Sequence, residues 1–355
     1  MNRRGLRRIL IHGAPESAVP SSRGDDLVTS PSADPANRAA GGQPAARFWD
    51  DLRAEVGRAV VGAEVPLRLV ALTLLADGHV LVEDVPGTGK TLLARAIARA
   101  LDLATARIQG TPDLLPVDVT GSSIFEGTGL RFVPGPVFTN VLIVDEINRA
   151  TPRTQAALLE AMQEHQATIE GTTRALPVPF IVLATQNPIE FEGTFALPQA
   201  QLDRFLVRIA MGYPDEAGER QIARRYQAQA EPLDSIRPIA DAARILELRA
   251  LARQVHVGEE VEAYVVAITR ATRDHPDLEL GASPRASVAL YRVAQAAALL
   301  EGRSFVLPDD VKAVVPAVLE HRLVVDLDRS IRGATIEAIV GGILAEVPVP
   351  PFVEA

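Results

Sequence analysis

The chain contains no cysteine, few aromatic residues and only two lysines, Lys90 and Lys312, among its 36 basic residues. The absence of cysteine excludes disulfide bonds and thiolate metal ligands, and it is typical of a protein of the reducing cytoplasm. Because aromatic residues make up 4% of the chain and hydrophobic residues 47%, we expect a core of aliphatic side chains. No apolar run approaches the ~18 to 20 residues that span a bilayer, so we expect a cytoplasmic protein without a membrane span.

The charge of the chain is unevenly distributed. The net charge is −9, yet the first 46 residues carry six arginines against four acidic residues, so the remainder is more acidic still. Non-specific nucleic-acid binding depends on neutralising phosphates with basic side chains. An acidic body therefore disfavours a nucleic-acid partner, although a local basic channel is compatible with this composition.

The length of 355 residues favours two domains with tails. Residues 12–45 are rich in Ala, Pro, Ser, Gly and Asp and lack periodicity, so we expect a disordered N-terminal tail over residues 1–46. An extension from a wrongly chosen start codon would explain this composition equally well. We expect an α/β domain over residues 47–213, a helical domain over 214–345 and a C-terminal tail over 346–355.

Lys90 lies in the segment Pro86-Gly87-Thr88-Gly89-Lys90-Thr91. The preceding apolar run 79–83 predicts a buried strand, and residues 91–98 predict a helix. In this context the backbone amides of a glycine-rich loop cradle phosphates, and a flexible lysine reaches their oxygens where a planar arginine would not fit. The segment therefore predicts a P-loop. Asp84 stands where the strict motif has glycine, and a turn with a chance lysine is the alternative.

Two further apolar runs, 141–144 and 180–184, predict buried strands that end in polar residues. Strands that alternate with helices indicate a parallel sheet covered by helices on both faces, with ligands bound at the carboxyl ends of the strands. Glycine-punctuated residues 121–135 and residues 166–179 interrupt this alternation and predict two hairpins. After residue 214 we expect helices only, at about 215–230, 238–254, 259–274, 284–302, 308–320 and 331–344.

The polar residues at the strand ends predict the chemistry of the site. Asp145 would hold Mg²⁺ through water together with the Thr91 hydroxyl, and Glu146 would orient and deprotonate an attacking water. An acidic pair after a strand is otherwise typical of a solvated helix cap. Asn187 would hydrogen-bond the same water or a terminal phosphate, and an ordinary Asn-Pro turn is its alternative.

Two arginines lie where they could reach nucleotide phosphates. We place Arg204 between the two domains, where it could stabilise phosphate charge in a neighbouring subunit; an ion pair with Asp203 or Glu190 is the alternative. Arg285 follows Ser283 and Pro284, which predict a helix start. It could reach phosphates from there, or it could be an exposed first-turn arginine, which the helix dipole mildly disfavours.

With these residues in place, residues 47–345 resemble the MoxR family of AAA+ ATPases. The resemblance depends on six segments in the family's order: Leu81 to Thr91, Gly110 to Pro116, Phe132 to Phe138, Val144 to Ala150, Ala184 to Glu190, and Gln199 to Phe205. It implies a P-loop AAA+ sandwich of helices around a parallel sheet, with inserted β-hairpins and a following helical lid domain.

The resemblance also implies roles for individual residues. Asn187 corresponds to sensor 1, Arg204 to the arginine finger and Arg285 to sensor 2, and the two hairpins would face the ring pore or the substrate. ATP would contact the residues Val60, Val61, Gly62, Pro86, Gly87, Thr88, Gly89, Lys90, Thr91 and Leu92. Mg²⁺ would be the second cofactor.

Family members form rings, usually hexamers, and act as chaperones on protein clients, often with a partner that carries a von Willebrand factor A domain. We therefore expect an ATP-hydrolysing chaperone. Two alternatives remain: a motor that acts on nucleic acid, and a scaffold that is gated by ATP with little turnover. The acidic body and the scarcity of basic residues in the hairpins disfavour the motor, and the complete set of catalytic residues disfavours the scaffold.

Overall fold

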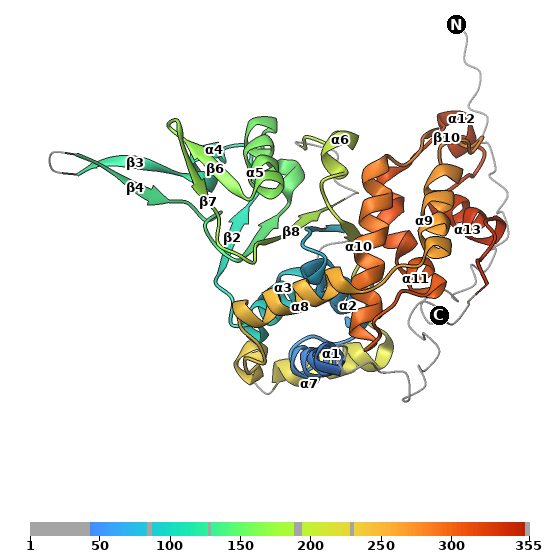
Figure 1. Ribbon diagram of the computed structural model, residues 1–355. Helices are drawn as coiled ribbons and strands as arrows, with labels where there is room; N and C mark the ends of the chain where they lie inside the picture. Colours follow the sequence, from blue (N-terminus) through green and yellow to red (C-terminus); the bar gives the residue numbers. More distant parts are fainter. Residues whose placement is uncertain (1–42, 84–86, 127–128, 188–193, 228–230, 352–355) are drawn as a thin grey trace, which may run out of the picture.

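The computed structural model describes residues 43–83, 87–126, 129–187, 194–227 and 231–351 (Figure 1). Residues 1–42 of the expected tail, Asp84, Pro86, Glu190 and residues 352–355 lie outside the described residues. The first helix, α1, spans Gln43–Gly57 and so begins four residues before the expected boundary. Its first turn buries Ala45 completely, and this packing explains the early start.

A parallel sheet of five strands forms the centre of the α/β part, in the order β2-β5-β8-β1-β9. The strands are β1 (Val80–Glu83), β2 (Thr105–Gln109), β5 (Val141–Asp145), β8 (Ile181–Gln186) and β9 (Val207–Ile209). The three central strands confirm the prediction from apolar runs. The two edge strands, β2 and β9, were not predicted.

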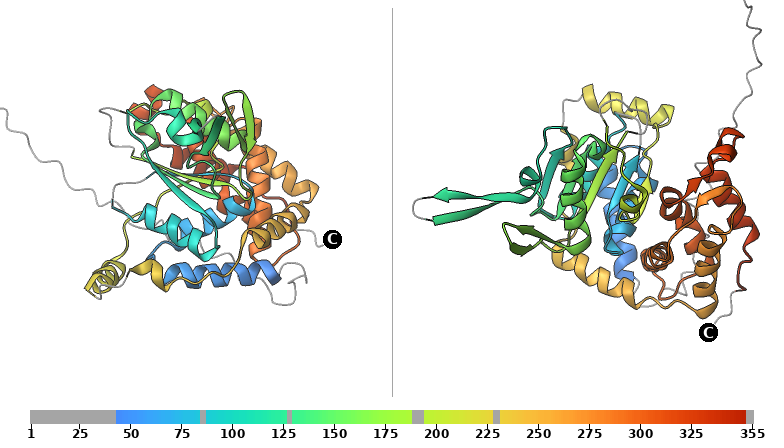
Figure 2. Two further views of the ribbon diagram at one scale, coloured as in Figure 1. Left: turned by 90° about the vertical axis from the view of Figure 1, so that its left-hand side faces the viewer. Right: turned by 90° about the horizontal axis from the view of Figure 1, so that it is seen from above.

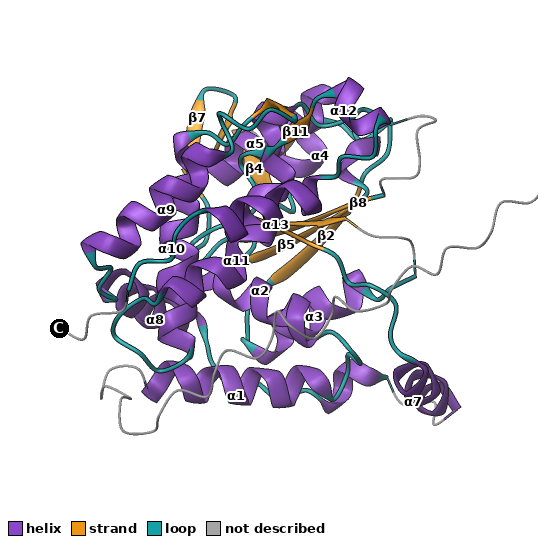
Figure 3. Ribbon diagram, turned by 90° about the vertical axis from the view of Figure 1, so that its right-hand side faces the viewer, coloured by secondary structure: helices purple, strands orange, loops and turns teal. Residues whose placement is uncertain are grey.

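Helices cover both faces of this sheet (Figure 3). Side chains alternate along each strand, so Val141 and Ile143 share a core with α3 (Lys90–Ala100), while Leu142 and Val144 share another with α5 (Pro152–Glu164). Strands buried on both faces read as unbroken apolar runs. The layered arrangement confirms the predicted αβα sandwich.

His79 ties two of these layers together from the residue before β1. The backbone N–H of Val182 donates to His79 Nδ1 at 3.0 Å, so Nε2 carries the proton and donates to the Met162 carbonyl at 2.9 Å. Burial lowers the pKa of His79 to about 4, because a charged imidazolium would lose its hydration there. The side chain is therefore neutral at pH 7.

Both expected hairpins are present. The first consists of β3 (Gly121–Glu126) and β4 (Gly129–Pro134) and projects far from the body as an arm (Figures 1 and 2). The second consists of β6 (Gln166–Ile169) and β7 (Thr172–Ala175). Near its tip, the arm exposes Phe125 and Leu130, which retain 74% and 71% of their accessible surface. Exposed apolar side chains that gather in this way make the arm a candidate binding surface.

The rest of the chain is mainly helical, as expected, and α10 packs on α1 and α2. The remaining α-helices are α2 (Glu64–Leu75), α4 (Pro116–Thr120), α6 (Gln199–Leu202), α7 (Glu216–Gln227), α8 (Ala242–Gln254), α9 (Glu259–Ala271), α10 (Pro284–Leu300), α11 (Pro308–Leu319), α12 (Leu327–Ile331) and α13 (Ile336–Glu346). Single-turn 3₁₀ helices are η2 (Ile147–Arg149), η3 (Pro232–Ser235) and η4 (Glu320–Arg322).

The lid region differs from the expectation of helices only. Strands β10 (Leu278–Leu280) and β11 (Val324–Val325) form a short antiparallel pair. Elements of two or three residues are too short to show an alternating pattern, so the sequence gives no signal for them. Across the described ranges, no helix combines the length and the hydropathy needed to cross a bilayer.

Candidate active site

The glycine-rich loop joins the end of β1 to the start of α3. Gly87 and Gly89 have φ angles of +88° and +89°, a left-handed conformation that side chains other than glycine rarely adopt. Lys90 and Thr91 are the first two residues of α3, where backbone N–H groups lack partners within the helix. A helix start behind a glycine turn is suited to bind a phosphate.

Asp145 ends β5 directly beside this helix start. The Thr91 hydroxyl lies 3.3 Å from Asp145 Oδ1 and 3.4 Å from Oδ2. A hydroxyl beside a carboxylate gives the hard oxygen donors that Mg²⁺ prefers, so these residues fit the ion. The described residues hold no cluster of three or more His, Asp or Glu side chains that could bind a metal, so phosphate oxygens and water would complete its coordination.

Glu146 follows Asp145 in a left-handed conformation, with φ at 55°. Outside glycine, this conformation costs roughly 1–2 kcal/mol and requires support from its surroundings. The Glu146 N–H donates to Thr185 Oγ1 at 2.9 Å, and the Gly110 N–H donates to the Asp145 carbonyl at 2.7 Å. Strands on both sides of β5 therefore fix the direction of the Glu146 side chain.

Two residues of β2 that the sequence analysis did not identify hold the acidic pair. Arg107 Nε lies 2.6 Å from Asp145 Oδ2, and Gln109 Nε2 donates to Glu146 Oε2 at 2.9 Å. Alternate residues of a strand point to the same side, which brings both side chains to the acids. The signal was the polar–apolar alternation of Arg107, Ile108 and Gln109 before the segment that begins at Gly110.

Eight of the predicted site residues line one cavity of about 400 Å³. They share it with Thr185 and with the two β2 side chains. The cavity is lined by Gly87, Gly89, Lys90, Thr91, Leu92, Arg107, Gln109, Asp145, Glu146, Thr185 and Asn187. Its walls combine cationic groups, backbone donors and carboxylates, which is the composition of a site for phosphate and a metal ion.

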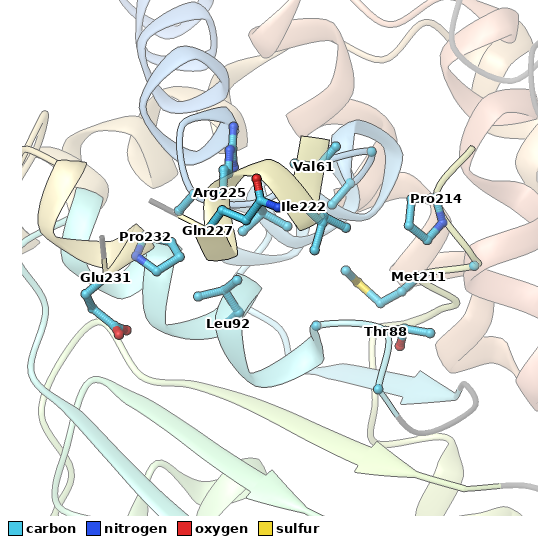
Figure 4. A pocket seen from close by; sticks show the side chains of 17 residues that line it. Val61, Thr88, Leu92, Met211, Pro214, Ile222, Arg225, Gln227, Glu231 and Pro232 are labelled. Atoms are coloured by element: carbon cyan, nitrogen blue, oxygen red, sulfur yellow. The ribbon is translucent and has the colours of Figure 1, made fainter. Parts of the chain in front are cut away.

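A second cavity of about 760 Å³ lies on the other side of the glycine loop. Val60, Val61 and Gly62, the expected contacts of the base, line it together with residues 87–89. The side chains of Leu92 on α3, Met211 in the segment after β9 and Ile222 on α7 converge on the cavity (Figure 4). Met211 and Ile222 were not predicted. A largely apolar cavity beside a phosphate loop suits the flat ring of a nucleotide base.

The two predicted arginines lie outside these cavities. Neither Arg204 nor Arg285 is among the described residues that line them. Asp203 pairs with Arg322 at 2.8 Å, and Arg204 Nε is buried without a hydrogen-bond partner among the described residues. Arg285 is exposed, and its N–H donates to Ser283 Oγ, which caps α10 as predicted. A single chain therefore does not bring these arginines to the site.

Comparison with known proteins identifies relatives of the chain. Residues 79–207 match the ATPase family associated with various cellular activities (AAA), and residues 270–340 match the AAA lid domain. The chain is 44% identical over 312 residues to the uncharacterised protein YeaC of Bacillus subtilis, with 85% of this chain and 97% of YeaC covered. It is 41% identical to Chaperone MoxR1 of Mycobacterium tuberculosis, with 83% and 81% covered.

A crystal structure of a candidate ATPase from Cytophaga hutchinsonii superposes with a TM-score of 0.82 at 36% identity, covering 88% of this chain and 97% of that one. Proteins named MoxR from Methylorubrum extorquens and Paracoccus denitrificans are 34% and 36% identical over most of the chain. The sequence identities, the match to the lid domain and the structural superposition all indicate the same family. The chain therefore belongs to the MoxR family of AAA+ ATPases.

Proposed function

We propose that the chain hydrolyses ATP with Mg²⁺ at this site and works as a chaperone on a protein client. The observation that carries the proposal is the convergence of Lys90, Thr91, Asp145, Glu146 and Asn187 on one cavity beside an apolar pocket. Phosphate binding, metal binding and water activation need these groups within a few ångströms of each other.

The chain's residues would divide the reaction between them. Lys90 and the amides at the start of α3 bind the phosphate oxygens. Glu146 takes the proton of the attacking water, which Asn187 positions, while the Gln109 hydrogen bond orients the Glu146 carboxylate. Bound through Thr91 and Asp145, Mg²⁺ would neutralise charge that develops on the phosphates.

We propose that Arg204 completes the site of a neighbouring subunit in a ring, with six subunits as the expected number. Arg204 lies outside the cavities of its own chain, which supports this arrangement, because an arginine that acts in trans contributes to the nucleotide site of the neighbouring subunit. We place Arg285 at the phosphates after lid movement. A partner with a von Willebrand factor A domain remains part of the proposal through the family resemblance.

The relative named Chaperone MoxR1 and the exposed apolar arm both support a protein client. The nucleic-acid motor is further disfavoured by the partners of the hairpins' basic residues. Arg131 pairs with Glu126 at 2.5 Å, and the Arg174 guanidinium lies 4.0 Å from the Phe132 ring centroid. Each of the two guanidinium groups therefore already has a partner within the hairpins, which weakens its attraction for a phosphate backbone.

The test is steady-state ATP hydrolysis across protein concentration, with particle mass measured in parallel, for wild type, Glu146→Gln and the control Glu160→Gln. Glu160 lies on α5 and is exposed. We expect turnover to rise as rings form, to vanish in Glu146→Gln and to persist in Glu160→Gln. Undiminished turnover of Glu146→Gln would remove that residue from catalysis, and negligible turnover of wild type with ATP bound would favour the scaffold.

A further inference from the structure

The turn η4, at the end of lid helix α11, inserts its arginine into the loop that carries Arg204. Arg322 Nε lies 2.8 Å from Asp203 Oδ1, and its two other nitrogens donate to the carbonyls of Phe205 at 2.6 Å and Leu206 at 3.1 Å. The Arg322 side chain keeps only 3% of its accessible surface. One lid side chain therefore binds the carboxylate that precedes Arg204 and the two carbonyls that follow it.

The two other residues of η4 reinforce this contact. Burial lowers the pKa of His321 well below its ordinary value, and the charge of Arg322 adds to the effect, so the ring is neutral; its Nε2 lies 3.0 Å from the Phe205 carbonyl. Glu320 binds Arg208 of β9 at 2.8 Å, and Arg208 also binds Glu83, at the end of β1, at 2.9 Å. The turn thus spans from the loop of Arg204 to the strand that leads into the phosphate loop.

Asp203 adds a second connection to the lid. Ser283 Oγ donates to Asp203 Oδ2 at 3.2 Å, while Arg322 occupies Oδ1. Ser283 caps α10 two residues before Arg285. One carboxylate beside Arg204 is therefore held from two places in the lid, and one of them is the helix start that carries Arg285.

We propose that Arg322 is a positioning residue that fixes Arg204 to the lid, so that displacement of the lid displaces Arg204 in the adjacent site of the ring. The inference rests on the proposed function of Arg204 in trans. Loss of the clamp would lower turnover at the neighbouring site while the subunit's own nucleotide site remains intact. Buried, multiply bonded arginines are suited to this role because their planar donors fix several acceptors at once.

The test variant is Arg322→Lys, which keeps the charge but replaces three separate donor nitrogens in a planar fork with a single nitrogen. Its matched control is Arg303→Lys. Arg303 is likewise buried, with 6% of its side chain exposed, and its Nη1 and Nη2 bind Asp310 at 2.7 Å and 2.5 Å, but this pair lies within the lid. We expect the two variants to lose similar thermal stability, whereas only Arg322→Lys should lose turnover.

For Arg322→Lys we expect kcat to fall at least about tenfold, with KM and the affinity for a fluorescent ATP analogue within about twofold of wild type. Mixing Arg322→Lys protein with excess Lys90→Ala protein should restore turnover. In such mixed rings the Lys90→Ala subunits supply an intact Arg204 to the nucleotide sites of the Arg322→Lys subunits. Equal loss of kcat in Arg303→Lys, or no rescue in mixed rings, would overturn the inference. If Arg322→Lys does not fold, Asp203→Asn is measured with the same expectations.

Arg204→Ala, measured in parallel, separates this inference from the proposed function. Full turnover of Arg204→Ala would contradict the trans role of that arginine itself. Lost turnover in Arg204→Ala, together with unchanged turnover in Arg322→Lys, would contradict only the role of the lid clamp.

Discussion

Gly110 offers a sharp test of how the sheet positions Glu146, the proposed catalytic base. A Cβ atom on Gly110 would lie 2.1 Å from the Glu146 carbonyl oxygen and 2.8 Å from its carbonyl carbon. Both contacts are with backbone, so no flexible side chain can move aside. Gly110→Ala must therefore separate β2 from the end of β5, where Glu146 is held in its left-handed conformation.

The size of the effect follows from the overlap. Restoring an ordinary contact requires a displacement of roughly 1 Å at Glu146, and a misplacement of that size costs about 100-fold in rate. This corresponds to about 2.7 kcal/mol of transition-state stabilisation. The three atoms nearest the added Cβ belong to the backbone of Asp145 and Glu146 and not to α3, so nucleotide affinity should stay near wild type.

The assay compares kcat at saturating ATP with the dissociation constant of a fluorescent ATP analogue. Gly57→Ala is the control, because Gly57 ends α1 and a Cβ there would meet nothing within 4 Å. Turnover of Gly110→Ala within about threefold of wild type would refute the reasoning. A matching loss of nucleotide affinity would show that the contact acts on binding instead.

Three further outcomes follow from the geometry. Lys90→Ala should weaken binding of an ATP analogue roughly 100-fold, since a charged donor to phosphate is lost; unchanged affinity measured by titration would exclude the P-loop assignment. Arg107→Ala should lower the Mg²⁺ concentration for half-maximal nucleotide binding roughly two- to fivefold, because a partly exposed ion pair no longer competes with the ion for Asp145. The control Arg95→Ala, on the exposed side of α3, should leave this concentration unchanged. The pKa of His79 is about 4 when folded and 6.5 in the unfolded chain, so its stabilising effect is complete above pH 6.5 and is lost as pH falls toward 4. Urea unfolding of wild type should lose about 2 kcal/mol more between pH 7.5 and 5 than His79→Gln; parallel profiles would contradict the buried neutral ring.

The sequence predicts the centre of the fold better than its edges. Strands β1, β5 and β8 are buried on both faces, so their residues form continuous apolar runs. Strand β2 lies at an edge and buries only Ile108 of its five residues, and β9 has only three residues. Five alternating residues in β2 and three residues in β9 are too few to establish a strand, so neither was predicted from pattern alone.

The candidate site likewise contains contacts that the sequence pattern predicts and contacts that it does not. Residues at the ends of the central strands could be predicted to meet, because parallel strands end at one edge of the sheet. The contact of Gln109 with Glu146 depends on the register that pairs Gln109 with Asp145, and no local signal specifies that register. The ion pair between Asp203 and Arg322 joins residues from different domains, and burial rather than sequence spacing selects the partners.

The two lysines give this molecule an unusual chemical selectivity. Lys90 lines the phosphate cavity, whereas Lys312 lies on α11, 3.9 Å from Asp309 and far along the chain from the loop. Arginine guanidinium groups do not react with amine-specific acylating reagents under mild conditions, because they remain protonated. With nucleotide bound as we propose, such a reagent should find the Lys90 ε-amino group shielded and the Lys312 ε-amino group accessible. The ratio of label on the two peptides is therefore an internal gauge of site occupancy, read by mass spectrometry without any engineered tag.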